Sequence, residues 1–226
     1  MIAKAPARPR RSAQRSGIRR HVNVDPKAAT SLRAVRAEAK RCRDCPLWKN
    51  ATQTVFGEGP QAANIFFVGE QPGDQEDLSG EPFVGPAGKL LDRALEQAEI
   101  DRGVTYVTNA VKHFKFEPRG KRRIHKKPNE MEIGACHQWY ERELKLVQPD
   151  LIVALGATAA RAVFGRATPI EVNRGRIIEP GDDESGRTAD VLVTVHPSYL
   201  LRMPEEDRHA AFERFVADLK LAKRYL

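Results

Sequence analysis

Residues 65–74 read Ile-Phe-Phe-Val-Gly-Glu-Gln-Pro-Gly-Asp, an apolar run followed at once by a polar turn that contains glycine and proline. Four consecutive apolar residues, 65–68, predict a strand that is buried on both faces, as strands of parallel sheets are. In open parallel sheets, ligands bind outside the carboxyl ends of the strands. The turn at 69–74 therefore lies where a functional site is expected.

The same alternation of short apolar runs and amphipathic segments continues along the chain and predicts an α/β domain with a largely parallel sheet. Sequentially, the strands alternate with helices, which is the order that βαβ units require. Beyond the first strand, further strands are expected at 104–108, 151–155 and 191–195, and helices at 30–41, 88–98, 129–147, 157–164 and 205–224.

Polar motifs follow three of the four predicted strands. Gly69 begins the first motif, Asn109 comes directly after the second strand, and His196-Pro197-Ser198 follows the fourth. Because the carboxyl ends of parallel strands meet at one edge of the sheet, we expect these motifs to lie together.

The composition favours a polyanionic partner. The chain of 226 residues has a formal net charge of +8 and a pI of about 9.6, with 41% hydrophobic residues. Nucleic acid is the first candidate, and a highly charged surface without such a partner is the alternative. No apolar run approaches the roughly 18 residues of a membrane helix, so we expect a cytoplasmic protein with no membrane partner. Residues 1–26 are basic and interrupted by proline, which predicts a disordered tail before a domain at 27–226.

Residues 112–127 form the most basic stretch. Eight of these sixteen residues are Lys or Arg, and Glu117 is the single acid. We predict a loop, broken by glycine and proline, that lies against phosphates. His125 differs in kind from its neighbours, because a neutral imidazole beside a polyanion can act as a nucleophile or base. The alternative is a histidine that merely contacts phosphate.

Three cysteines suggest a metal centre. Cys42 and Cys45 have the two-residue spacing that lets both thiolates hold one centre, and the proline after Cys45 is typical of iron–sulfur sites. Cys136 and a histidine, His113, are the candidates for the remaining ligands. Such a set can also hold zinc, and a buried, inert cysteine pair is the further alternative.

Several motifs together resemble those of the family-4 uracil-DNA glycosylases, over residues 38–224. The resemblance implies a three-layer α/β/α sandwich with a central, mainly parallel four-stranded sheet, and a DNA-repair enzyme with a [4Fe–4S] cluster on four cysteines. His113 stands where that family has its third cysteine, and residues 121–125, Lys-Arg-Arg-Ile-His, are an insertion. Both departures resemble the UdgX subgroup. The motifs are residues 69–73, 82–85, 108–112 and 196–198.

The resemblance also implies roles for the motif residues. Phe83 is expected to stack on uracil, and Asn109 to accept from N3–H and donate to O4, which rejects cytosine. His196 is expected to donate to O2 as negative charge develops there. Gln71 is also expected among the uracil-binding residues. It is similar in position to the water-activating aspartate of family-1 enzymes but has no basic lone pair, so water activation is weakened.

In the UdgX subgroup, the histidine of the inserted segment bonds to the DNA sugar after uracil leaves, which implies this role for His125. Glu70 is expected to accept the proton that the imidazole loses, with Asp74 as the second candidate. Arg123 is expected to brace the inserted segment. Phosphate contacts are expected from Lys121, Arg122 and Ser198.

The sequence thus predicts a glycosylase that becomes covalently attached to uracil-containing DNA in a single turnover. Two alternatives stay open: a conventional multiple-turnover family-4 enzyme, and a non-catalytic module that binds uracil-DNA. A dinucleotide-binding enzyme fits less well, because residues 69–73 lack the GxGxxG spacing. We expect the protein to be a monomer that accepts single-stranded DNA.

Overall fold

The computed structural model describes residues 31–181 and 188–226 of the chain. The basic tail expected at 1–26 lies outside the described residues. Among the described helices, none combines the length and the apolar character that crossing a membrane would need.

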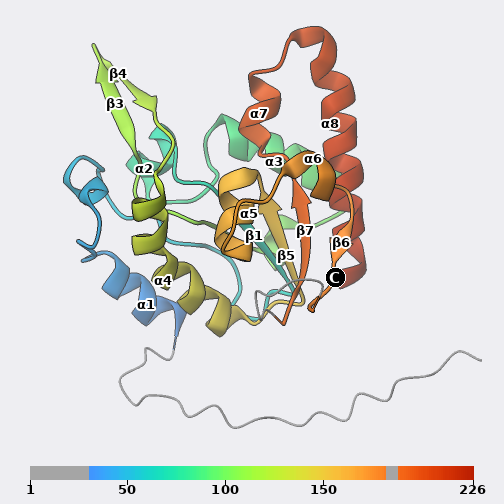
Figure 1. Cartoon of the computed structure of the whole chain (residues 1–226), viewed down its shortest axis with the longest axis horizontal. Coiled ribbons are helices and arrows are strands. Elements are labelled where there is room, and N and C mark those ends of the chain that lie inside the picture. The colour runs from blue at the N-terminus through green and yellow to red at the C-terminus, as the bar shows by residue number, and fades with distance from the viewer. Residues whose placement is uncertain (1–30, 182–187) are drawn as a thin grey trace, which may run out of the picture.

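A five-stranded sheet forms the centre of the molecule (Figure 1), with the strand order β2-β1-β5-β7-β6. The first four of these strands are parallel, and β6 pairs antiparallel with β7. This confirms the predicted α/β fold with a mainly parallel sheet. The sheet has one strand more than predicted. The additional strand, β6, is only two residues long, which is too short to give a recognisable sequence pattern. The strands are β1 (Ile65–Gly69), β2 (Tyr106–Asn109), β5 (Leu151–Leu155), β6 (Ile177–Ile178) and β7 (Asp190–Thr194).

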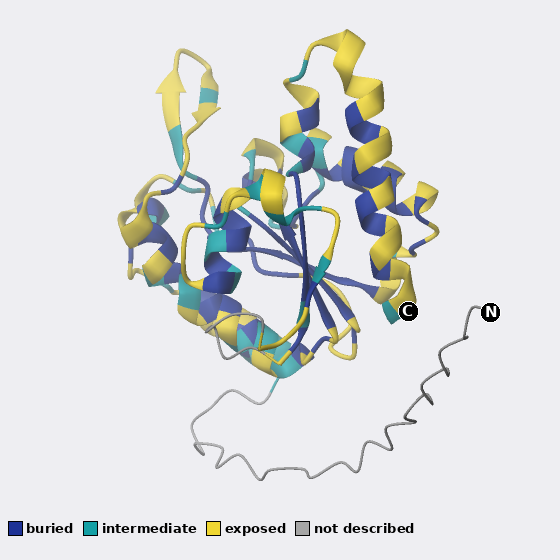
Figure 2. Cartoon of the chain, turned by 45° about the vertical axis from the view of Figure 1, so that its right-hand side comes forward, coloured by how far each residue is buried: buried dark blue, intermediate teal, exposed yellow. Residues whose placement is uncertain are grey.

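Helices cover both faces of the sheet and make the three layers. Alternate residues of β1 point to opposite faces, so Phe67 packs with α3 (Pro86–Gln97) and α8 (Glu205–Lys220), whereas Phe66 packs toward α4 (Glu130–Val147). The second face also receives α5 (Ala157–Phe164). Figure 2 shows the strands buried between these layers. The strand residues are apolar throughout because both faces are covered.

A smaller group of buried residues lies to one side of the sheet. Here α1 (Leu32–Ala39) packs against α4, and the cluster includes Cys45 and Cys136. The expected helix at 30–41 is therefore present within the described residues. Short helical turns complete the fold: η1 (Pro46–Lys49), α2 (Asp74–Ser79), η2 (Arg102–Val104), α6 (Ile170–Asn173), α7 (Pro197–Leu201) and η3 (Leu221–Tyr225).

The basic stretch is not a loop as predicted but a two-stranded antiparallel hairpin. Strand β3 (Phe116–Arg119) pairs with β4 (Arg122–His125), and Phe116 lies opposite His125. Gly120 takes a φ of +59° in the connecting turn, a conformation that glycine adopts without strain. The hairpin, residues 116–125, projects from the body of the molecule and is largely exposed (Figures 1 and 2).

Candidate active site

A pocket of about 930 Å³ opens at the carboxyl ends of the parallel strands, between the hairpin and α7. The sheet edge, the hairpin and α7 come from distant parts of the sequence, and the parallel topology brings them to one place. Most of the predicted site residues line this pocket: Glu70, Gln71, Asp74, Phe83, Asn109, His125, His196 and Ser198.

Phe83, Asn109 and His196 line the side of the pocket next to the strand ends, here called the pocket floor, and Gly69 packs against Asn109 and Phe83. Asn109 is buried, and its side-chain oxygen has no hydrogen-bond partner among the described residues. An unpaired buried acceptor is costly unless a ligand supplies a donor. Asn109 also lines the pocket, so an unpaired amide oxygen lies buried at the pocket floor.

Gly69 is required where the floor is tightest. A Cβ at this position would lie 2.4 Å from Asn109 Oδ1 and 2.5 Å from Phe83 Cζ. Phe83 itself is buried and adopts a φ of +57°, which is rare for an aromatic residue. Arg102 stabilises this conformation by donating to the Phe83 carbonyl at 3.2 Å. The floor thus holds an aromatic ring and an amide side by side.

His196 is held as a neutral hydrogen-bond donor. Its Nδ1 accepts from the backbone N–H of Ser198 at 3.1 Å and lies 2.8 Å from the Ser198 hydroxyl, so Nε2 carries the proton in the neutral ring. Burial is the largest cause that lowers the pKa of His196 to about 4, and the nearby Arg202 and His125 add to it. The ring centroid lies 5.8 Å from that of Phe83.

His125 and Glu70 face each other at the pocket mouth. His125 Nε2 lies 3.5 Å from Glu70 Oε1, and the other carboxylate oxygen of Glu70 accepts from the Thr158 hydroxyl at 2.5 Å. Burial lowers the pKa of His125, opposed by Glu70 and reinforced by Arg202. The pair therefore consists of a neutral imidazole and a carboxyl group whose orientation Thr158 fixes.

Gln71 connects the hairpin to the sheet. Its amide nitrogen donates to the backbone carbonyls of Lys115 and Lys126 at 3.2 and 3.1 Å, and its amide oxygen accepts from the Lys115 N–H at 3.1 Å. These bonds use both donors of the carboxamide and one lone pair of its oxygen. The sequence analysis assigned Gln71 to uracil, whereas its side chain bonds to the base of the hairpin.

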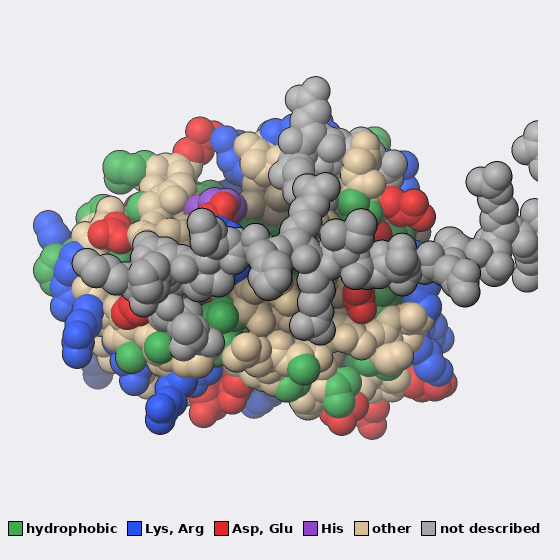
Figure 3. Space-filling model, turned by 90° about the horizontal axis from the view of Figure 1, so that it is seen from below, with side chains coloured by type: hydrophobic (Ala, Val, Ile, Leu, Met, Phe, Trp, Pro, Cys, Tyr) green, Lys and Arg blue, Asp and Glu red, His purple; other side chains and the backbone are tan. Residues whose placement is uncertain are grey.

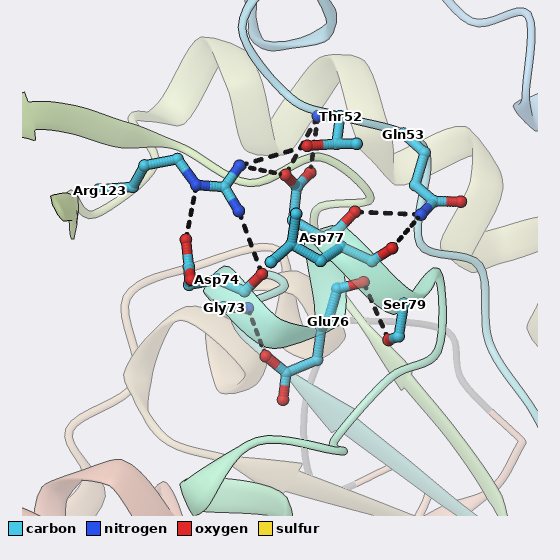
Figure 4. Close-up of polar contacts among 9 residues, drawn as sticks. Thr52, Gln53, Gly73, Asp74, Glu76, Asp77, Ser79 and Arg123 are labelled. Carbon is cyan, nitrogen blue, oxygen red and sulfur yellow. Dashed lines mark hydrogen bonds and ion pairs between the residues drawn. The ribbon is translucent and has the colours of Figure 1, made fainter. Parts of the chain in front are cut away.

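Arg123 holds the hairpin to α2 (Figure 4). Its guanidinium donates to Asp74 Oδ1 and Asp77 Oδ2, each at 2.5 Å, and its carbon lies 5.4 and 5.1 Å from the ring centroids of Phe114 and Phe116. Asp74, the second candidate for proton transfer, is thus paired with Arg123, and Glu70 is the acid beside His125. Asp77, which is fully buried, was not found from the sequence.

The remaining basic residues occupy two different places. Lys121 and Arg122 are exposed at the end of the hairpin, away from the residues that line the pocket. Arg202 lines the pocket and donates to the Ser198 hydroxyl at 3.2 Å, a contact that the sequence analysis missed. Seen from below, the molecule carries acidic and basic side chains intermingled (Figure 3).

Three of the candidate metal ligands, Cys42, Cys45 and Cys136, lie in or against the buried cluster on the α1 and α4 side. Cys45, Cys136 and His113 are buried and Cys42 is partly buried, and all three cysteines are free thiols. Burial raises the pKa of Cys136 to about 12 and also raises that of Cys45. His113 Nε2 lies 2.9 Å from the Thr54 hydroxyl, while its buried Nδ1 lacks a partner among the described residues. Buried thiols beside an unpaired ring nitrogen fit a metal that would deprotonate them.

In the described ranges 31–181 and 188–226, no three His, Cys, Asp or Glu side chains are grouped around a position for one metal ion. Cys42, Cys45, His113 and Cys136 would be the residues to hold a metal centre, since thiolates and an imidazole nitrogen are suitable donors for iron.

Comparison with known proteins agrees with this geometry. Residues 56–220 match the family model of the uracil DNA glycosylase superfamily. The chain is 39% identical over 197 residues to the type-4 uracil-DNA glycosylase of Thermotoga maritima, which covers 86% of this chain and 94% of the relative. It is 36% identical over 179 residues to the type-4 enzyme of Archaeoglobus fulgidus, which covers 77% and 85%.

The chain therefore belongs to the uracil DNA glycosylase superfamily. Within that superfamily it belongs with the type-4 uracil-DNA glycosylases, since both relatives are more than a third identical over most of their length. The predicted family-4 membership is confirmed.

Proposed function

We propose that this type-4 protein excises uracil from DNA and then becomes joined through His125 to C1′ of the sugar, as in the UdgX subgroup. The observation that carries the proposal is the 3.5 Å approach of His125 Nε2 to Glu70 Oε1 at the mouth of the pocket. An ordinary glycosylase needs only a water molecule at that point.

Recognition of uracil is assigned to the pocket floor. The unpaired Asn109 Oδ1 accepts from N3–H of uracil, and its amide nitrogen donates to O4. Cytosine presents the reverse polarity on this edge, so binding it would leave buried polar groups unpaired. Phe83 stacks on the base that has been turned out of the strand.

Cleavage breaks the bond from C1′ to N1, and its electron pair leaves with uracil. The sugar acquires positive charge, as in other oxocarbenium-like reactions of glycosides. His196 donates from Nε2 to O2 of uracil, where negative charge increases as the bond lengthens. The low pKa of the protonated ring means that His196 is neutral at pH 7, and Ser198 fixes its orientation. The Nε2–H group can therefore stabilise the charge on O2 by hydrogen bonding while it keeps its proton.

Capture follows when a ring nitrogen of His125 donates its lone pair to C1′. The product is an imidazolium, which can leave again until the proton on its other nitrogen is removed. Glu70 accepts that proton, so the sugar ends bonded to a neutral imidazole, a poor leaving group. Thr158 keeps the Glu70 carboxylate in place for this transfer.

The hairpin supplies the effective concentration that capture requires. Gln71 fixes the base of the hairpin and Arg123 joins β4 to α2, so His125, although half exposed, is kept at the mouth of the pocket. Lys121 and Arg122 are assigned to phosphate contacts, and Ser198 with Arg202 to a phosphate at the other side of the mouth.

We assign a [4Fe–4S] cluster to Cys42, Cys45, His113 and Cys136, in a structural role that ties the N-terminal segment to the hairpin base and α4. The buried thiols and the unpaired Nδ1 of His113 support this assignment. The substrate is uracil-containing DNA, single strands included, and the protein acts as a monomer.

A denaturing gel tests the proposal. Mixing the protein with labelled single-stranded DNA that contains one uracil is expected to give a band that survives boiling in detergent, and His125→Ser is expected to lose it. His137→Ser is the matched control, since His137 is also a partly exposed histidine beside a glutamate, on α4.

The outcomes separate the candidates. If His125→Ser still forms the band, or if peptide mapping finds the sugar on another side chain, His125 is not the nucleophile. Excess abasic DNA without a band indicates a conventional type-4 enzyme. Binding without uracil release indicates a non-catalytic module.

A further inference from the structure

The strand end that carries Asn109 is held from behind by a buried ion pair that takes no part in the proposed reaction. Lys112 and Glu143 are both fully buried, and Lys112 Nζ lies 2.5 Å from Glu143 Oε2. Replacing a buried ion pair by neutral residues often leaves stability unchanged or raises it. Stability alone therefore does not account for this pair.

The ammonium group of Lys112 closes a turn. Besides Glu143, it donates to the Thr108 hydroxyl at 2.6 Å and to the backbone carbonyl of Asn109 at 2.7 Å. All three of its N–H groups are thus used. The bond from residue 112 back to residue 109 fixes the backbone on which the Asn109 side chain stands.

The closed turn, residues 109–112, is bonded to the end of β1. The N–H of Ala110 donates to the Gly69 carbonyl at 2.9 Å, and the N–H of Val111 donates to the Glu70 carbonyl at 3.0 Å. The turn therefore sets the position of Asn109 relative to Glu70. Asn109 contacts uracil in the proposed function, whereas Glu70 faces His125.

Glu143 fixes the position of the Lys112 ammonium group. Its carboxylate also accepts from the backbone N–H of Gly57 at 2.8 Å, the Tyr106 hydroxyl at 3.1 Å and the Thr108 hydroxyl at 3.0 Å. With acceptors satisfied from several segments, the carboxylate cannot turn away from Lys112. Helix α4 is thereby linked to the pocket floor.

We infer that Lys112 is a positioning residue for uracil recognition: its ammonium group holds the turn 109–112 so that the Asn109 carboxamide stays at the pocket floor and Glu70 faces His125. The inference rests on the proposed reading of uracil by Asn109. It assigns to Lys112 an effect on the reaction that its contribution to folding does not explain.

The test uses the full-length double variant Lys112→Met/Glu143→Gln, which removes the ammonium group without leaving a buried charge unpaired. Single-turnover uracil release is measured against DNA concentration, with circular dichroism to establish folding. We expect a normally folded protein in which the maximal rate divided by the half-saturating DNA concentration falls about 10- to 100-fold.

Leu219→Ala is the control for lost stability. Leu219 is fully buried on α8, and its truncation leaves a cavity outside the pocket lining. We expect it to lower the melting temperature and to keep the wild-type rate. The inference is overturned if the double variant releases uracil like wild type, or if Leu219→Ala, still folded, loses as much activity.

An added Asn109→Ala exchange shows whether the effect passes through Asn109. In that background the double variant is expected to cause little further loss, because the side chain that Lys112 positions is already gone. Fully additive losses contradict the inference.

If the double variant does not fold, Thr108→Val removes one acceptor of the ammonium group without exposing a charge. A smaller loss in the same ratio is expected, and an unchanged ratio overturns the inference. Wild-type protein that releases no uracil would instead refute the proposed function.

Discussion

The pocket floor and the hairpin form opposite walls of one pocket and are built in different ways. The floor is buried at the strand ends and includes Asn109 Oδ1, which has no hydrogen-bond partner among the described residues. The hairpin is largely exposed and is held by side-chain contacts from Gln71 and Arg123. In the proposed reaction, recognition and cleavage therefore belong to the buried floor, and capture belongs to the exposed hairpin, which can be loosened separately.

Damage to the floor should stop both events. Asn109→Ala removes the amide that reads uracil, and we expect uracil release to fall about 100- to 1000-fold, as for loss of one preorganised polar group in an active site. Adduct formation should fall with it, because capture follows cleavage. Single-turnover release and the gel band are measured together, with the exposed Asn64→Ala as control. Adduct formation without uracil release would contradict the claim that capture follows cleavage.

Loosening the hairpin should separate the two events. Arg123→Met removes the ion pairs to Asp74 and Asp77, so His125 spends less time at C1′. We expect adduct formation to fall about 10- to 100-fold, with uracil release much less affected. The neighbouring Arg122→Met, at an exposed position, is the matched control. Equal losses in both reactions would show that the hairpin also serves cleavage.

A change of pH gives the smallest effect and sharpens the assignment. Both histidines must be neutral, and both pKa values lie below the ordinary value of 6.5, that of His196 at about 4. Protonation sets in as pH falls through these lowered values. Adduct formation should therefore stay constant from about pH 8 to 7 and decline only at pH values below 6.5.

Glu70→Gln provides the check on that profile. Glu70 raises the pKa of His125, so its neutral replacement should move the decline of adduct formation to still lower pH. The profile of uracil release, which depends on His196, should not move. A decline centred at or above 6.5 in the wild type would contradict the assignment of neutral histidines.

Much of the fold was predictable because its elements are long and apolar. The strand at 151–155 and the helix at 157–164 match β5 and α5 at both ends. The helix at 205–224 ends as α8 at Lys220 and continues as a 3-10 turn, and the strand expected from Val104 begins at Tyr106. Errors at such boundaries arise because helix ends and loops depend on local contacts.

The hairpin could not be predicted because its stability comes from residues far along the chain. Its sequence carries charges on both faces and includes Pro118 within the first strand, and both features weaken the usual signal of a strand. Arg123 bonds to Asp77, 46 residues away, and Gln71 bonds to Lys126, 55 residues away. Lys112 was predicted to lie against phosphates with the rest of the basic stretch, but it is fully buried and paired with Glu143, a partner that nothing local in the sequence indicates.

Gly69 determines in which direction base selectivity can be altered. Glycine is the smallest residue, and even the methyl group of an alanine at this position would collide with Asn109 and Phe83. No exchange at this position can enlarge the cavity, so variants that accept bulkier nucleobases must be sought at Phe83 or Asn109. Laboratory selection for such variants should consequently leave codon 69 untouched.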